Sequence, residues 1–310
     1  MNGLPLPAWG LSKARLQILE FVTAVTADDG PHYVVPADRI AVFDNDGTLW
    51  SERPVVQGAF TIDRIKAMAP DHPEWTATQP YQGVLEGDFE AVAASGDQAL
   101  GELLMVTHTG ITTEEFTALV GDWIATAKHP TTGALYTDMV YQPMLELLAY
   151  LRANDFATYI VSGGEIVFMR AFAEEVYGIP PEQVIGSSIE TAYEMREEGP
   201  ALVRQPAIDF VDDGPGKPVA IEHFIGRRPL ICFGNSDGDH EMLQWTAAGE
   251  CPRLMGLIHH TDGEREWAYD KDARPGGLES ALTEARERDW IVVDMKNDWT
   301  VVHKYAADAA

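Results

Sequence analysis

Cysteine is almost absent from this chain. Its 310 residues include two, Cys232 and Cys251, which are too few for a framework of disulfide bonds. Cys232 lies inside an apolar run, so we expect it to be buried as a small hydrophobic residue. A packed core must therefore hold the fold, and 45% apolar residues in a chain of this length are enough to form one.

Long apolar runs are also missing. No run reaches the roughly 18 apolar residues that a membrane-spanning helix needs, and the start of the chain lacks a basic segment followed by a continuous apolar one. We therefore expect a cytoplasmic protein, with a periplasmic or secreted location as the alternative if a leader is missing.

Basic residues are scarce. The chain has 22 Lys and Arg against 49 Asp and Glu, which gives a formal charge of −27. Such a field repels nucleic acids and anionic membranes, so neither is an expected partner. A site for an anionic substrate would have to supply its own local positive charge.

What the chain does contain is a series of short apolar runs separated by helical patterns. The runs span residues 39–43, 157–161, 229–233, 254–258 and 290–293. Continuous apolar strands that alternate with helices are typical of a parallel sheet covered on both faces. We therefore expect an α/β fold with a doubly wound parallel sheet.

Three of these runs lead into polar residues. The first ends at Asp44, the second at Ser162 and the third at Gly234 and Asn235. In open parallel α/β sheets, ligands bind just beyond the carboxyl ends of the strands. We therefore expect these side chains to converge on one site.

Roughly 90 residues separate the first two runs, far more than a crossover connection needs. Helical patterns fill this segment at 60–69, 97–107 and 113–127, the last with a cap formed by Thr112 or Thr113 and an acid such as Glu115. We interpret residues 55–139 as a helical cap domain, and residues 1–54 and 140–310 as the catalytic core. Within the core we expect a helix over 165–177 and a β-hairpin over 184–205.

The segment FDNDGTLW, residues 43–50, carries the strongest chemical signal. Side chains alternate along a strand, so Asp44 and Asp46 can face the same side, and Gly47 permits the sharp turn that follows. Two carboxylates this close repel each other unless a cation lies between them. A hard divalent ion with oxygen ligands fits, and Mg²⁺ suits a reaction of phosphate. The alternative is an Asp-Gly turn with solvated acids.

Four ordered motifs give the chain a resemblance to a known family. FDNDGTLW resembles the first signature of the haloacid dehalogenase superfamily, in its aspartate-phosphatase branch; VSGGE, GPGKP and GNSDGDHEML are similar to the later three. The SGG sequence and the hairpin point to the phosphoserine-phosphatase-like group, and the wider pattern is similar to relatives of phosphorylcholine phosphatase. The resemblance implies a Rossmann-like core, with a helical cap inserted after the first catalytic strand.

The resemblance, together with the chemistry, assigns the catalytic roles. Asp44 would attack phosphorus and form an aspartyl phosphate, and Asp46 would act as acid and then base. Ser162 and the Gly163 amide would hold phosphoryl oxygens. Lys217 would supply the local positive charge and bind the substrate.

The metal ligands follow in the same way, with one departure from the family. The expected set is Asp44, the Asp46 carbonyl, Asn235 and Asp239. Many relatives place an aspartate where this chain has Asn235. We expect Asn235 to be the direct ligand, and Asp239 to act through water or as support.

The substrate and several alternatives stay open. The linker after the first motif places Trp50 and Glu52 as candidate substrate-binding residues. The aromatic residues Trp75, Tyr81 and Phe89 could line a cap pocket, but at this spacing they are more typical of a cap core. We expect hydrolysis of a small phosphomonoester, phosphoserine- or phosphorylcholine-like, with a phosphotransferase or mutase as the alternative.

Other reactions on the same scaffold are less favoured. A dehalogenase does not need a second acid such as Asp46. A phosphonate hydrolase would use a cap lysine, but nothing near Lys66 or Lys128 favours either. A non-catalytic binding module would not need Asp44 or Lys217, and both are present.

Overall fold

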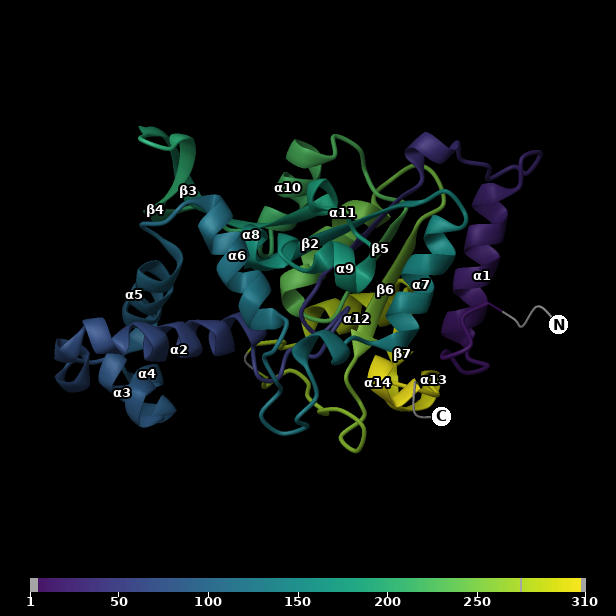
Figure 1. Cartoon of the computed structure of the whole chain (residues 1–310). Coiled ribbons are helices and arrows are strands. Elements are labelled where there is room, and N and C mark those ends of the chain that lie inside the picture. Colours follow the sequence, from purple (N-terminus) through teal and green to yellow (C-terminus); the bar gives the residue numbers. More distant parts are fainter. Residues whose placement is uncertain (1–4, 274, 308–310) are drawn as a thin grey trace.

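A single seven-stranded sheet forms the centre of the computed structural model, which describes residues 5–273 and 275–307 (Figure 1). The strands are β1 (Ile40–Phe43), β2 (Ala157–Glu165), β3 (Val184–Arg196), β4 (Gly199–Phe210), β5 (Ile231–Gly234), β6 (Leu254–His259) and β7 (Ile291–Asp294). Their order is β4-β3-β2-β1-β5-β6-β7, and every neighbouring pair is parallel except β3 and β4. The expected α/β fold is confirmed, and all five apolar runs form strands.

Helices connect these strands in the expected places. The α-helices are α1 (Lys13–Thr26), α2 (Val56–Met68), α3 (Tyr81–Glu86), α4 (Phe89–Ala94), α5 (Gly96–His108), α6 (Thr113–Ile124), α7 (Gln142–Arg152), α8 (Ile166–Arg170), α9 (Ala173–Tyr177), α10 (Gly216–Phe224), α11 (His240–Ala247), α12 (Ser280–Glu287), α13 (Met295–Asp298) and α14 (Lys304–Ala307). Short 3₁₀ turns span Pro36–Asp38, Ala69–Asp71, Pro73–Ala77, Tyr136–Asp138, Pro181–Gln183 and Asp237–Asp239. No helix in the described part of the chain has both the length and the apolar character needed to cross a membrane.

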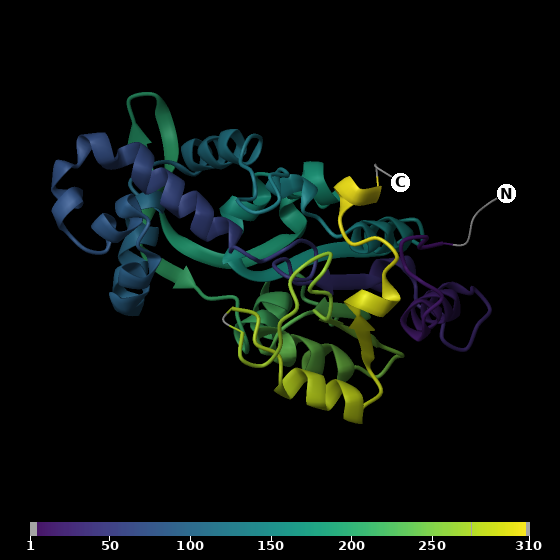
Figure 2. The same cartoon turned by 90° about the horizontal axis from the view of Figure 1, so that it is seen from below.

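The sheet buries apolar side chains on both faces because its strands alternate. In β1, Ala41 and Phe43 belong to one buried cluster, whereas Ile40 and Val42 belong to another. Helices α10, α11 and α12 cover the second face, and α7 lies on the opposite side (Figure 2). The buried Cys232 packs in the second cluster, as expected.

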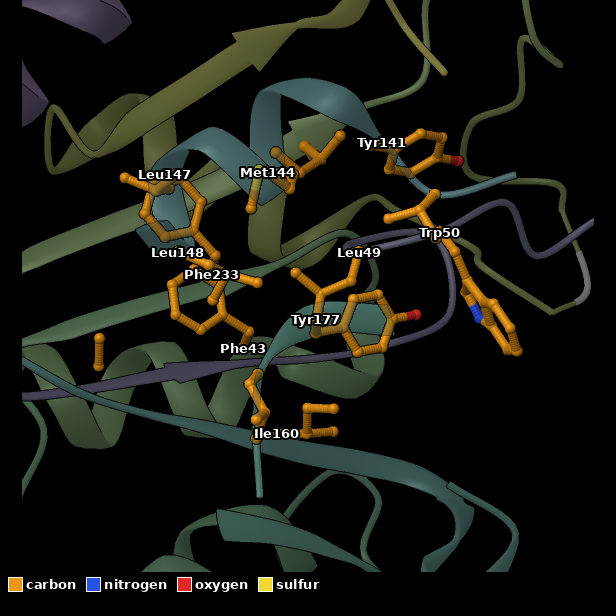
Figure 3. Close-up of a cluster of buried hydrophobic side chains, with 14 of the residues drawn as sticks. Phe43, Leu49, Trp50, Tyr141, Met144, Leu147, Leu148, Ile160, Tyr177 and Phe233 are labelled. Atoms are coloured by element: carbon orange, nitrogen blue, oxygen red, sulfur yellow. The ribbon is translucent and has the colours of Figure 1, made fainter. Parts of the chain in front are cut away.

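The first cluster lies next to the loop that follows β1. Phe43 stacks on Phe233 of β5, with ring centroids 5.7 Å apart, and Figure 3 shows both beside Leu147 and Leu148 of α7. All four side chains are fully buried. The packing of these side chains therefore fixes β1, which precedes Asp44, relative to β5, which precedes Asn235.

The segment between β1 and β2 is helical, with α2 to α6 and an apolar cluster of its own. That cluster contains Trp75, Tyr81, Val84 and Leu103, so two of the three aromatic residues considered above are core residues. Phe89, by contrast, is 52% exposed. We propose that residues 55–139 form the cap domain. The separate cluster supports this division for residues 65–103, whereas Phe60 and Phe116 of the same segment pack in the main core.

Two expected elements differ in the structure. The helix expected over 165–177 is two short helices, α8 and α9, because the chain turns at Ala171 and Phe172 so that both faces pack into the core. The expected hairpin continues to Phe210, and β4 contacts α5 and α6. The hairpin therefore packs against the helical segment as well as the sheet.

A buried arginine ties the hairpin to this segment. Arg204 of β4 donates from Nε to the carbonyl oxygen of His108, at 2.6 Å, and its guanidinium lies 3.1 Å from Glu165 and over the ring of Phe116. His108 itself is fully buried between Phe60 and Phe116. Burial, helped by the charge of Arg204, lowers the pKa of His108 to about 3.

This burial makes a pH-dependent contribution to stability. The unfolded chain protonates His108 at its ordinary pKa of 6.5, whereas the folded protein does not, so stability is complete above pH 6.5 and is lost as the pH falls. Between pH 7 and pH 5, the free energy of unfolding of the unchanged protein should fall by about 2 kcal/mol more than that of the His108→Phe variant, whose ring fits the same aromatic site. Urea unfolding at both pH values measures this difference. His223→Phe, at an exposed histidine, should leave the pH dependence of stability unchanged. If His108→Phe shows the same pH dependence as the unchanged protein, His108 is not the group responsible.

Candidate active site

A cavity of about 600 Å³ lies beyond the carboxyl ends of β1, β2 and β5. The predicted site residues that line it are Asp44, Asp46, Glu52, Ser162, Gly163 and Lys217. The strand order explains this, since β2, β1 and β5 are adjacent and parallel. The structure thus brings most of the predicted residues together at one edge of the sheet.

Lys217 connects two of the acids at the floor of this cavity. Its Nζ donates to Asp44 Oδ1 at 2.7 Å, to Asp239 Oδ1 at 2.5 Å and to the carbonyl oxygen of Val161 at 3.0 Å. Burial lowers the pKa of Lys217, but the charges of Asp239 and Asp44 raise it by more, so the lysine stays charged. Burial and Asp239 raise the pKa of Asp44, against the opposing effect of Lys217. Among the described residues that line the cavity, Lys217 is the one cation.

Asp239 has little capacity left to bind a metal directly. Besides accepting from Lys217, it accepts through Oδ2 from the backbone amides of Asn235 and Ser236, at 2.9 and 3.0 Å. It is fully buried and does not line the cavity. Of the roles considered for Asp239, the geometry therefore favours support of Lys217 and of the loop after β5.

The side-chain amide of Asn235 lies beside Asp44 and the backbone of Asp46. One atom of that amide is 3.0 Å from the carbonyl oxygen of Asp46 and 3.3 Å from Asp44 Oδ2, and with the nitrogen at that place the amide donates to both oxygens. With the amide turned the other way, its oxygen would stand with these two as a set of three ligands for a cation. The donor set of carboxylate, amide and peptide carbonyl suits Mg²⁺. Among the described residues, no three His, Cys, Asp or Glu side chains come together as a metal site, either here or elsewhere.

Trp50 has a different place from the one expected. Its side chain is fully buried, stacks on Phe172 at 4.8 Å and does not line the cavity. Its indole Nε1 donates to Asp46 Oδ1 at 2.7 Å, while burial raises the pKa of Asp46. The expected substrate contact of Trp50 is therefore corrected to a role in orienting Asp46, because the backbone turns this side chain into the core, where it packs on Phe172.

Glu52 does face the cavity. It is 4% exposed, and its Oε1 has no hydrogen-bond partner. Burial raises the pKa of this carboxyl to about 7. Its predicted contact with substrate stays a prediction.

The loop after Ser162 comes unusually close to the start of α2. Ser162 Oγ accepts from the Gly164 amide at 3.3 Å. Gln57 accepts from the Glu165 amide at 3.0 Å, and its Nε2, which is buried without a partner, lies where a side chain at position 164 would have to go. Sequence reasoning missed Gln57, since nothing in the linker marks it.

A second set of missed residues comes from the loop after β6. Residues 275–277 line the cavity; their Pro-Gly-Gly sequence indicates a turn, but nothing in it places that turn at the cavity. In the same loop, His260 contacts the backbone of the first motif. Its Nε2 lies 2.8 Å from the Gly47 carbonyl oxygen, and its Nδ1 lies 3.3 Å from Glu266. Burial raises the pKa of Glu266, but the hydrogen bond and charge of His260 outweigh this and hold it below its usual value.

Gly47 is the backbone position on which this geometry depends most directly. It has φ +77°, and a Cβ there would overlap the Asn235 amide. A left-handed conformation costs a non-glycine residue about 1–2 kcal/mol, and the overlap adds to this cost.

We therefore expect Gly47→Ala to be more destabilising than Gly133→Ala. Gly133 has a similar φ of +70° but nothing within 4 Å of its Cβ position, so it isolates the conformational cost. Urea unfolding measures the stability of both variants, and thermal unfolding with and without Mg²⁺ measures the cation site. Mg²⁺ should raise the Tm of Gly133→Ala but not of Gly47→Ala; equal behaviour of the two would contradict the role of Asn235.

Comparison with known proteins places this site in a family. A family model described as "haloacid dehalogenase-like hydrolase" matches residues 41–244, while no curated protein has a significantly similar sequence. Among solved structures, a conserved functionally unknown protein from Anaerococcus prevotii DSM 20548 is 18% identical, with 90% of each chain covered and a TM-score of 0.58. A protein with unknown function from Bordetella pertussis Tohama I is 15% identical, covers 83% of this chain and 98% of its own, and has a TM-score of 0.50.

The two structures share the fold of this chain. The matched range includes Asp44, Ser162, Lys217 and Asn235. The resemblance read from the four motifs is confirmed: the chain belongs to the haloacid dehalogenase-like hydrolases.

Proposed function

We propose that this hydrolase is a magnesium-dependent phosphatase that cleaves phosphomonoesters through a phosphorylated Asp44. The observation that supports it is the environment of the Asp44 carboxylate. One oxygen accepts from Lys217 at 2.7 Å, and the other lies 3.3 Å from the side-chain amide of Asn235, beside the cavity. A carboxylate that is held in this way, next to a second acid, is suited to attack an electrophile.

Asp44, the Asp46 carbonyl and Asn235 would hold Mg²⁺. The ion would neutralise part of the charge on the phosphoryl group. Lys217 acts from the other side of Asp44, and the Ser162 hydroxyl and Gly163 amide would bind the remaining phosphoryl oxygens. Mg²⁺ and Lys217 would supply the local positive charge that a phosphate site requires in a chain of formal charge −27.

Two displacements would complete the reaction. In the first, Asp44 Oδ attacks phosphorus, the bond from phosphorus to the ester oxygen breaks, and Asp46 donates a proton to the leaving alcohol. In the second, Asp46 takes a proton from water, which attacks phosphorus and releases phosphate from Asp44. The indole of Trp50 fixes one Asp46 oxygen, so the carboxyl is oriented for both steps. A dehalogenase would have no use for such an oriented second acid.

The first test is the loss of the nucleophile. Asp44→Asn should lower the rate of hydrolysis across a panel of phosphomonoesters by roughly 10⁴-fold or more, as nucleophile removal does in other hydrolases. The unchanged protein should need Mg²⁺, and Asp29→Asn, at an exposed surface acid, should retain full activity. Turnover that persists in Asp44→Asn would refute the assignment of the nucleophile.

The second test separates the two roles of Asp46. With p-nitrophenyl phosphate the leaving group needs no proton, so Asp46→Asn should still phosphorylate Asp44 but release phosphate about 10²–10⁴-fold more slowly. Rapid mixing should then show a burst of one nitrophenolate per protein molecule, followed by slow turnover. Steady turnover at the unchanged rate, without a burst, would show that Asp46 is not the base.

A further inference from the structure

An apolar groove runs along α2, next to the catalytic cavity. It consists of two adjoining hollows of about 480 and 410 Å³, both lined by Gly58, Ile62 and Phe89. We call these two hollows the α2 groove. In Figure 1, α2 leads from the carboxyl edge of the sheet outward to α3, α4 and α5, so the groove points away from the catalytic residues.

The walls of the α2 groove are mostly hydrocarbon. Apart from Gln57, Thr61, Asp63 and Lys128, its remaining lining is apolar and includes Leu103 and Tyr136. Three of its large apolar side chains are solvent-exposed: Val55 at 38%, Leu100 at 44% and Phe89 at 52%. Contiguous exposed apolar surface is typical of a binding site.

The groove adjoins the catalytic cavity. Val55 lines both the cavity and one hollow, and Gln57 lines both the cavity and the other. Gln57 is also bonded to the Glu165 amide, at the end of the loop that begins with Ser162. A ligand whose phosphoryl group lies at Asp44 would therefore enter the groove past these two side chains.

Two glycines leave room in the groove. A Cβ at Gly58 would meet only Val55, at 3.8 Å, and one at Gly101 would meet nothing within 4 Å. Both positions lie in helices, where glycine is less favourable than other residues by about 1 kcal/mol. The space above them is thus open to a ligand.

We propose that the α2 groove binds the apolar part of the leaving alcohol, and that the substrates are phosphomonoesters of alcohols with an extended hydrocarbon chain. This inference rests on the proposed phosphatase function and adds the substrate class. The phosphoryl group lies at Asp44, the ester oxygen faces Asp46, and the chain passes Val55 and Gln57 into the groove. Water and the ester give phosphate and the free alcohol.

The test is a series of straight-chain alkyl phosphates, from ethyl through butyl and hexyl to octyl phosphate, with Mg²⁺. We expect kcat/KM to rise about two- to fourfold for each added methylene, up to the ~0.8 kcal/mol that a buried CH₂ contributes. Gly101→Leu should reduce the preference for octyl over ethyl phosphate by tenfold or more, without changing the rate with ethyl phosphate. Gly58→Leu should act in the same direction.

Gly121→Leu is the matched control. Gly121 also lies within a helix, with nothing within 4 Å of its Cβ position, but it does not line the cavity or the groove. Its replacement should leave the chain-length profile unchanged. Calorimetry with n-octyl phosphonate, which is not hydrolysed, gives a second readout: Gly101→Leu should bind it more weakly than Gly121→Leu does.

The outcomes separate the two proposals. A protein that hydrolyses ethyl and octyl phosphate equally well would overturn the groove inference and leave the phosphatase function intact. A protein that hydrolyses no ester in the series would overturn the phosphatase function itself. A concentration-dependent dimer that Gly101→Leu abolishes, together with a flat chain-length profile, would assign the groove to a second copy of the chain and overturn the inference.

Discussion

The buried contact of Lys217 with Asp44 and Asp239 is the interaction on which the rest of the site depends. Two carboxylates and one ammonium group lie within hydrogen-bond distance, almost without exposure to water. Burying such charges is costly unless each has partners, and removing one partner from a buried pair typically costs about 3–5 kcal/mol. Every group here is supplied with partners: the Val161 carbonyl accepts from the lysine, and backbone amides of the loop after β5 donate to Asp239.

This contact explains why the fold must bring three strands together. Asp44 follows β1, Val161 lies in β2, and Asp239 lies in the turn after β5, while Lys217 comes from the first turn of α10. A parallel sheet with β2, β1 and β5 side by side places all these atoms at one edge. The helical segment inserted between β1 and β2 then reaches this edge through Gln57. Residues of α2 also line the apolar groove, so one helix contributes to both the cavity and the proposed substrate-binding surface.

The motif residues were predictable because their chemistry is local. Apolar runs that end in Asp44, Ser162 and Asn235 indicate strand ends, and the family match confirms the resemblance that the motifs carried. Trp50 was placed incorrectly because an aromatic residue in a linker can turn to either side, and its stacking partner Phe172 lies more than a hundred residues away in the chain. Gln57 and residues 275–277 gave no interpretable signal, since they reach the cavity only after α2 and the loop after β6 have packed.

The sequence by itself determined the α/β class, the core strands and the family's four motifs, because hydrophobic periodicity and short motifs lie in consecutive residues. Only the tertiary structure decided the contacts between these side chains. Asp239 accepts a hydrogen bond from Lys217, the Trp50 indole donates to Asp46, and His260 lies against the Gly47 carbonyl oxygen. The physical reason is that burial and hydrogen bonding depend on neighbours that are distant in the chain. The same side chain can bind metal, bind substrate or support a loop according to what packs against it.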